Sequence, residues 1–156
     1  MQQTLELVWP GQHTAEDLEI LLEADNNQPL IERIPLLRVD HALRRGEMLL
    51  FRLHPGPGRI LAEIISDNGS KRLEMLRGAG RFGPSMHKIL ASLWAYATEL
   101  GCECVTTVVY SERFKRALEL SGASVEGWIL TYSEAGHGNQ EEEQNEVQQH
   151  TDGEAA

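Results

Sequence analysis

The sequence has few cysteines, no long apolar segment and no basic excess, and each shortage excludes a class of protein. No apolar run approaches the roughly 20 residues of a membrane span, and the first residues lack the basic-then-apolar order of a secretory signal. We therefore expect a soluble, cytoplasmic protein without a membrane partner. Cys102 and Cys104 are the only cysteines, and no further Cys or His pair has zinc-site spacing. We expect two reduced thiols in one core strand and no bound metal.

Negative charge is concentrated at the C-terminal end of the chain. Residues 134–156 contain seven acidic side chains and no Lys or Arg, so that of the net charge of −10 the remainder carries about −3. A body without basic excess offers no electrostatic support for generic nucleic-acid binding. The acidic segment is almost free of apolar residues and is predicted to be disordered. It is either a solvated terminus without a partner or an arm for a basic partner.

The length of 156 residues and the hydrophobic content of 41% fit one domain with one core. We place this domain at residues 1–133 and the disordered acidic tail at 134–156. The segments follow the order β-α-α-β-β-β-α-β-α-β, which predicts an α/β fold with a mixed sheet. The expected helices begin near residues 14, 40, 86 and 111. The expected strands are residues 5–9, 48–53, 59–66, 72–77, 105–109 and 128–132.

Three local patterns are specific enough to be tested. Thr14 and Asp17 have the spacing of a capping box at the start of the first helix. Pro35 interrupts residues 30–37, which we expect to be irregular, and Gly46 is in position to stop the second helix. The third pattern is an apolar stripe on the longest helix, formed by Met86, Ile89, Leu90, Leu93, Trp94, Ala97 and Leu100.

A glycine-rich segment lies between the third antiparallel strand and the longest helix. Gly78, Gly80 and Gly83 lack side chains that would hold a phosphate away from free amides at the helix start. The same glycines match the dinucleotide-binding pattern, but a three-strand meander precedes them, and Glu103 begins its strand instead of ending it, which disfavours a Rossmann site. A glycine turn that merely joins strand to helix is the remaining alternative.

The element order and this glycine loop resemble the GNAT superfamily of N-acetyltransferases over residues 4–133. The family loop reads Arg or Gln, two residues, Gly, one residue, and Gly or Ala. Arg77 and Gly80 match it, Phe82 stands at the third fixed position, and Gly83 follows one residue later. The resemblance implies acetyl-CoA as cofactor, bound through its pyrophosphate, and acetyl transfer to an amine acceptor of unknown identity. It places the following residues at the cofactor: Arg77, Gly78, Ala79, Gly80, Arg81, Phe82, Gly83 and Ser85.

The resemblance also implies a general base and a general acid. Glu63 and Glu74 are the candidate bases, although acidic residues alternating with apolar ones also form the solvated face of a sheet. The family's usual acid is a Tyr in the last helix, and Leu118 stands at that position. Tyr110 or Tyr132 would have to replace it, or each is a strand-end aromatic residue. The missing acid predicts slow or absent turnover.

Several shorter motifs resemble GNAT-like proteins encoded among the head genes of tailed bacteriophages. This resemblance implies an alternative function, a non-catalytic virion or head-associated structural protein whose partners are phage head proteins. Such a protein would be found in the host cytoplasm or in the virion. The motifs lie at residues 80–83, 94–95, 101–102, 113–116 and 121–123.

Overall fold

The computed structural model describes residues 4–28, 30, 33–80, 86–109 and 112–124, all of them within the compact unit Met1–Ser124. The final expected strand, 128–132, and the tail, 134–156, lie outside the described residues. In the part that is described, no helix has the length and apolar character needed to cross a membrane. The elements are β1 (Thr4–Val8), α1 (Ala15–Asn26), α2 (Leu36–Arg45), β2 (Leu49–His54), β3 (Arg59–Asp67), β4 (Ser70–Ala79), α3 (Met86–Glu99), β5 (Cys104–Thr107) and α4 (Glu112–Leu120).

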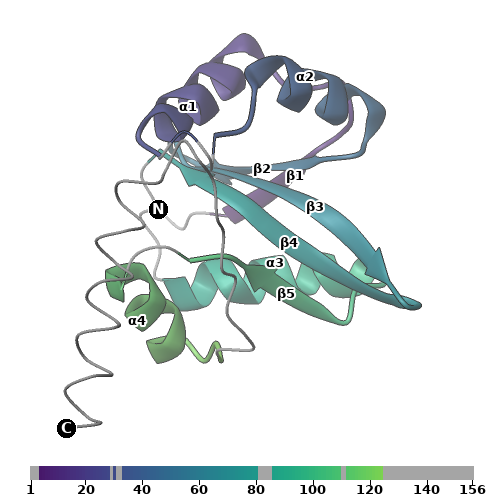
Figure 1. Cartoon of the computed structure of the whole chain (residues 1–156), viewed down its shortest axis with the longest axis vertical. Coiled ribbons are helices and arrows are strands. Elements are labelled where there is room, and N and C mark those ends of the chain that lie inside the picture. Colours follow the sequence, from purple (N-terminus) through teal and green to yellow (C-terminus); the bar gives the residue numbers. More distant parts are fainter. Residues whose placement is uncertain (1–3, 29, 31–32, 81–85, 110–111, 125–156) are drawn as a thin grey trace, which may run out of the picture. The chain divides into compact units, whose positions relative to one another are not determined.

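The five described strands form one mixed sheet in the order β1-β2-β3-β4-β5. The first four strands are antiparallel neighbours, and β5 runs parallel to β4 after the crossover through α3. Helices α1 and α2 cover one face of the sheet, and α3 and α4 cover the other (Figure 1). This arrangement confirms the predicted α/β class and the element order through α4.

Each face of the sheet has its own apolar core because neighbouring strand residues point to opposite faces. In β3, Leu61 packs toward α1 and α2, whereas Ile60 packs toward α3. The core under α1 and α2 includes Val8, Leu21, Val39, Leu43, Leu50 and Leu61, and the core under α3 includes Phe51, Ile60, Leu73, Ile89, Leu93 and Ala97.

The sequence predicted the start of α1 correctly, whereas for α2 it predicted the end but not the start. The hydroxyl of Thr14 accepts the amide of Asp17 at 3.3 Å, and the carboxylate of Asp17 accepts the amide of Thr14 at 2.7 Å, which confirms the capping box. Helix α2 begins at Leu36, four residues earlier than expected, because Pro35 precedes the helix as its N-cap instead of interrupting it. Gly46 ends α2 with a φ of 73°, as predicted.

Three further expectations were wrong. Trp94, placed in the apolar stripe of α3, is 48% exposed, whereas Leu93 beside it is fully buried. The two cysteines do not share a core strand, since Cys102 is buried before β5 and Cys104 is exposed at its first residue. Burial raises the pKa of the Cys102 thiol. Strand β5 runs from Cys104 to Thr107 instead of over residues 105–109, and most of its residues are half-buried.

Candidate functional site

The pairing between strands β4 and β5 ends about halfway along β4. Their pairing runs from Arg72 opposite Cys104 to Met75 opposite Thr107, whereas β4 continues to Ala79. Among the described residues, no backbone hydrogen bond joins β4 to β5 beyond Met75. The N–H and C=O groups along that edge of β4 can therefore pair with an extended ligand that contains amides.

A bulge in β4 lies at the point of separation. Leu61 of β3 pairs with Arg77 and Ala62 pairs with Met75, so Leu76 is an extra residue in β4. A bulge bends its strand and re-aims the side chains that follow. The extra residue places Arg77 on the same side of the sheet as Leu76, which is the side that α1 covers.

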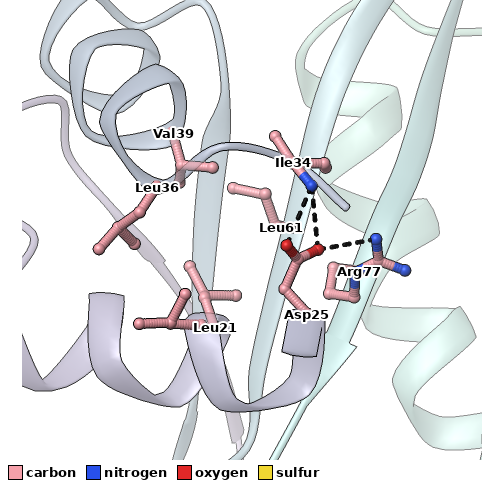
Figure 2. Close-up of a pocket in the computed structure, with 8 residues that line it drawn as sticks. Leu21, Asp25, Ile34, Leu36, Val39, Leu61 and Arg77 are labelled. Atoms are coloured by element: carbon pink, nitrogen blue, oxygen red, sulfur yellow. Dashed lines mark hydrogen bonds and ion pairs between the residues drawn. The ribbon is translucent and has the colours of Figure 1, made fainter. Parts of the chain in front are cut away.

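The guanidinium of Arg77 points to α1. Its Nη2 donates to Oδ1 of Asp25 at 3.0 Å, and the Asp25 carboxylate also accepts the amide of Ile34 (Figure 2). The two side chains are only 10% and 11% exposed. The crevice around them, shown in Figure 2, has about 10 Å³ of free volume, which admits no more than a water molecule. Arg77 thus has a structural partner, and its role beside a pyrophosphate stays a prediction.

The predicted glycine loop begins later than the sequence indicated, because Gly78 and Ala79 are paired residues of β4. Gly80 has a φ of +77°, and a Cβ there would lie 2.4 Å from the carbonyl oxygen of Pro57 in the β2–β3 turn. Glycine is therefore required at this position by packing alone. The remaining loop residues, Arg81, Phe82, Gly83 and Ser85, lie outside the described residues.

A buried ionic network, which the sequence did not reveal, holds the turn that Gly80 contacts. Asp17 is fully buried and accepts Nε of Arg59 and Nη2 of Arg52, each at 2.6 Å. Arg59 also donates to the carbonyl of Gly58 in the turn at 3.2 Å. Burial alone would raise the pKa of Asp17, but hydrogen bonds from both arginines and a backbone amide outweigh it and hold that pKa well below its usual range. Asp17 therefore links the start of α1 to this turn.

The two candidate bases are direct neighbours. Glu63 of β3 pairs with Glu74 of β4, and Glu74 pairs with Thr106 of β5, so the three side chains share one face of the sheet. Within the described residues, neither carboxylate has a hydrogen-bond or ion-pair partner, and Oγ1 of Thr106 is buried without one. Like charges on opposed strand residues are destabilising. This row ends beside the last β4–β5 pair, and no cation of the described residues neutralises its two carboxylates.

No protein-family model matches the sequence, and no curated protein matches it either. Solved structures do resemble it. AAC(6′)-Iy in complex with the bisubstrate analogue CoA-S-monomethyl-acetylneamine has a TM-score of 0.65 at 12% identity, covering 86% of this chain and 99% of that chain. A predicted acetyltransferase with acetyl-CoA from Clostridium acetobutylicum has a TM-score of 0.59 at 10% identity, covering 84% and 96%.

A third similar structure is the ribosomal-protein-alanine N-acetyltransferase from Brucella melitensis biovar Abortus 2308, with a TM-score of 0.60 at 12% identity, covering 85% of this chain and 100% of that chain. This chain has the GNAT acetyltransferase fold. The expected GNAT fold is confirmed, whereas the narrower resemblance to phage head-encoded proteins stays a prediction.

On this GNAT fold, a groove of about 500 Å³ lies beside α2, with α2 forming one wall and β3 contributing Glu63. We call it the α2 groove. Three of its residues, Arg38, His41 and Arg45, are exposed at positions i, i+3 and i+7 of α2. Sequence reasoning missed these residues, although their spacing was a readable signal. The groove is lined by Pro35, Leu37, Arg38, His41, Ala42, Arg45, Glu47, Met48 and Glu63.

The position that the GNAT resemblance assigns to the general acid is filled by a core residue. Leu118 in α4 is 5% exposed, so it packs inside the protein and offers no proton. The two candidate replacements, Tyr110 and Tyr132, lie outside the described residues. The structure therefore brings the two candidate bases together and leaves the candidate acids as predictions.

Proposed function

We propose that this protein is an acetyl-CoA-dependent N-acetyltransferase. The observation that carries the proposal is the opening between β4 and β5 beside the bulge at Leu76, on a GNAT fold. The pantetheine arm of CoA contains amides that can pair with the open edge of β4. Amides at the start of α3 would receive the pyrophosphate, with the loop that begins at Gly80 as its cradle. Two of the similar structures contain acetyl-CoA or a CoA analogue, which supports this choice of donor.

In the proposed reaction, the acceptor nitrogen attacks the thioester carbonyl carbon. The C–N bond forms, the C–S bond breaks, the nitrogen loses a proton, and the CoA sulfur gains one. Glu74 is the proposed base because it lies beside Met75, the last residue of β4 paired with β5, and has no cationic partner in the described part of the chain. Glu63, its neighbour on β3, is the alternative base.

The proposed acid is Tyr110 or Tyr132, since Leu118 has no proton to donate. General acid catalysis typically contributes about 10² to 10⁴-fold. Turnover is therefore expected to be slow unless one of these tyrosines reaches the leaving sulfur. The Tyr110→Phe and Tyr132→Phe variants test each tyrosine separately.

Leu118 also favours a second candidate function. A buried leucine at the acid position is what a GNAT fold that has lost its chemistry would contain, and such a module could serve as a phage head-associated structural protein. This candidate retains the fold and gives up transfer. Recovery of the protein from purified phage particles, together with no transfer to any amine, would favour it.

The deciding experiment is calorimetric titration of the full chain with acetyl-CoA, followed by transfer assays on a panel of amines. We expect binding, and a loss of at least tenfold in turnover for Glu74→Gln. Glu99→Gln, an exposed carboxylate at the end of α3, is the matched control and should leave turnover unchanged. Absence of acetyl-CoA binding would contradict the proposal, and binding without transfer would favour the second candidate.

A further inference from the structure

We propose that the α2 groove binds the acceptor, and that the acceptor is a primary amine that also carries an anionic group, a carboxylate or a phosphate. Its anionic group would contact Arg38, His41 and Arg45, and its amine would contact Glu63 and Glu74. The inference rests on the proposed transferase function and adds the chemical class of the acceptor.

The basic side of the groove has charge that the protein itself does not neutralise. Within the described residues, neither Arg38 nor His41 has a hydrogen-bond or ion-pair partner. The closest carboxylate to Arg45 is that of Glu47, at 3.9 Å, and both side chains are more than 60% exposed, so the contact is weak. These three residues span about 10 Å along the helix. They form an edge that favours an anion.

The single acidic residue of α2 does not reduce this charge. Asp40 accepts Nε2 of His13 at 2.6 Å and Nε of Arg44 at 3.2 Å, and the hydrogen bond from His13, followed by that from Arg44, lowers the pKa of the Asp40 carboxyl. Neither Asp40 nor Arg44 lines the α2 groove. Arg44 is therefore the natural control, because it is a paired arginine on the same helix.

The acidic side of the groove belongs to the sheet. Glu63 lines the groove, and Glu74 is its neighbour on the next strand, again without a cation in the described part. Two adjacent carboxylates attract an ammonium group. The row continues through Thr106 to the point where β5 leaves β4, which is where the proposed thioester would lie. An amine held at Glu74 would thus be close to that opening.

A ligand with both signs of charge satisfies both sides of the groove, whereas other amines satisfy only one. A polycation such as a diamine or an aminoglycoside would gain at the carboxylates and be repelled by the basic edge. A simple alkylamine would leave that edge unused. Selectivity is therefore expected to come from the anionic group, with the amine alone giving weak binding.

The test uses the full chain and four probes of similar length. They are 4-aminobutyrate, 3-aminopropylphosphonate, butylamine and butane-1,4-diamine. Binding is measured by NMR titration without acetyl-CoA, and kcat/KM for acetyl transfer is measured separately. We expect at least about tenfold tighter binding of one of the two anionic probes than of butylamine or the diamine, since hydrogen bonds to charged groups are the strong ones. The comparison of carboxylate with phosphonate identifies the anion.

The Arg38→Gln/Arg45→Gln variant should lose this tenfold preference, and the Arg44→Gln control should keep it. A diamine that binds as well as the best anionic probe would overturn the proposal, as would an unchanged preference in the double variant. If the preference is observed without transfer, the proposed reaction fails while the groove assignment holds. If transfer occurs without the preference, the groove assignment fails alone.

Discussion

Charged side chains under α1 are paired inside the protein, whereas two side chains of α2, Arg38 and His41, are exposed and have no partner in the described part of the chain. Asp17 is fully buried, and its carboxylate forms ion pairs with Arg52 and Arg59, each at 2.6 Å. Arg38 and His41 of α2 lie at the rim of an open groove and, in the part of the chain that is described, have no partner at all. The two helices cover the same face of the sheet (Figure 1).

The contrast separates charges that maintain the fold from charges that can serve a ligand. A buried carboxylate is stable only when its partners are inside the protein. The oxygens of Asp17 already accept hydrogen bonds from Arg52 and Arg59 and are therefore not available to a ligand. An exposed charge is solvated and can exchange water for a ligand at small cost to stability. Substitutions under α1 should therefore change stability, and substitutions along α2 should change recognition.

The largest effect is expected for Asp17→Asn. Removing one member of a buried ionic network leaves the charges of Arg52 and Arg59 uncompensated, which costs about 3–5 kcal/mol. Urea unfolding at neutral pH measures the loss. Glu19→Gln, an exposed carboxylate on the same helix, is the control and should change stability by less than about 0.5 kcal/mol. A loss of unfolding free energy below about 1 kcal/mol in Asp17→Asn would show that the buried network contributes little to stability.

The same variant has a signature in acid. The folded pKa of Asp17 is lowered, so its contribution to stability is fully present above the ordinary Asp pKa of about 4 and is lost as the pH falls toward the folded pKa. Asp17→Asn should therefore show a flatter decline of unfolding free energy below about pH 4 than the wild type. Parallel declines would show that the network does not depend on this carboxylate.

The next largest effect is expected for Gly80. Because it has no side chain, the backbone after β4 can pack closely against Pro57 in the β2–β3 turn. Gly80→Ala would place a Cβ 2.4 Å from the Pro57 carbonyl oxygen, whereas Gly69→Ala, at a similar φ of +83°, meets nothing within 4 Å. Both variants incur the left-handed backbone cost of about 1–2 kcal/mol, and Gly80→Ala should lose about 1–3 kcal/mol more. Equal losses in thermal or urea unfolding would show that this contact is unimportant.

Because a side chain at Gly80 would clash with Pro57, a substitution there can impair folding as well as cofactor binding. Gly80→Val should abolish acetyl-CoA binding if the loop holds the pyrophosphate through its amides, but it should also displace the turn. Loss of binding is therefore informative only in protein that unfolding data show to be folded. A well-folded Gly80→Val variant that binds acetyl-CoA normally would remove the loop from the proposed site.

Local signals made α1 and the order of elements predictable from the sequence. The capping box of Thr14 and Asp17 is complete within four residues, and Gly46 stops α2 by its own backbone conformation. The start of α2 was missed because a proline inside an apolar run can break a helix or precede one, and only packing decides which. Trp94 was assigned to the core by spacing, although it sits at the edge of the apolar stripe and is half-exposed.

The candidate site was less predictable because its features depend on distant pairings. Asp17 lies 35 residues from Arg52 and 42 from Arg59 in the sequence, so no local pattern relates them. The bulge at Leu76 exists only in the register between β3 and β4. Glu63 and Glu74 could be singled out by residue type, but their adjacency follows from that same register.

A smaller effect is expected for Arg77, which the GNAT resemblance places at the cofactor and which the structure pairs with Asp25. Arg77→Gln should reduce stability by about 1–3 kcal/mol, because Asp25 is nearly buried and would lose its cation. Acetyl-CoA affinity should fall less than threefold. Calorimetry and urea unfolding of Arg77→Gln measure both quantities, with Arg72→Gln in the same strand as control. A tenfold loss of affinity with unchanged stability would support the cofactor role instead.

The smallest effect is expected for removal of residues 136–156. This segment contains six acidic and no basic residues and is nearly free of apolar side chains, so it has little surface with which to offset the entropy of ordering. Deletion should leave the melting temperature within about 1 °C of the full chain, with any change upward because like-charge repulsion falls. A drop of several degrees would show that the segment packs on the domain.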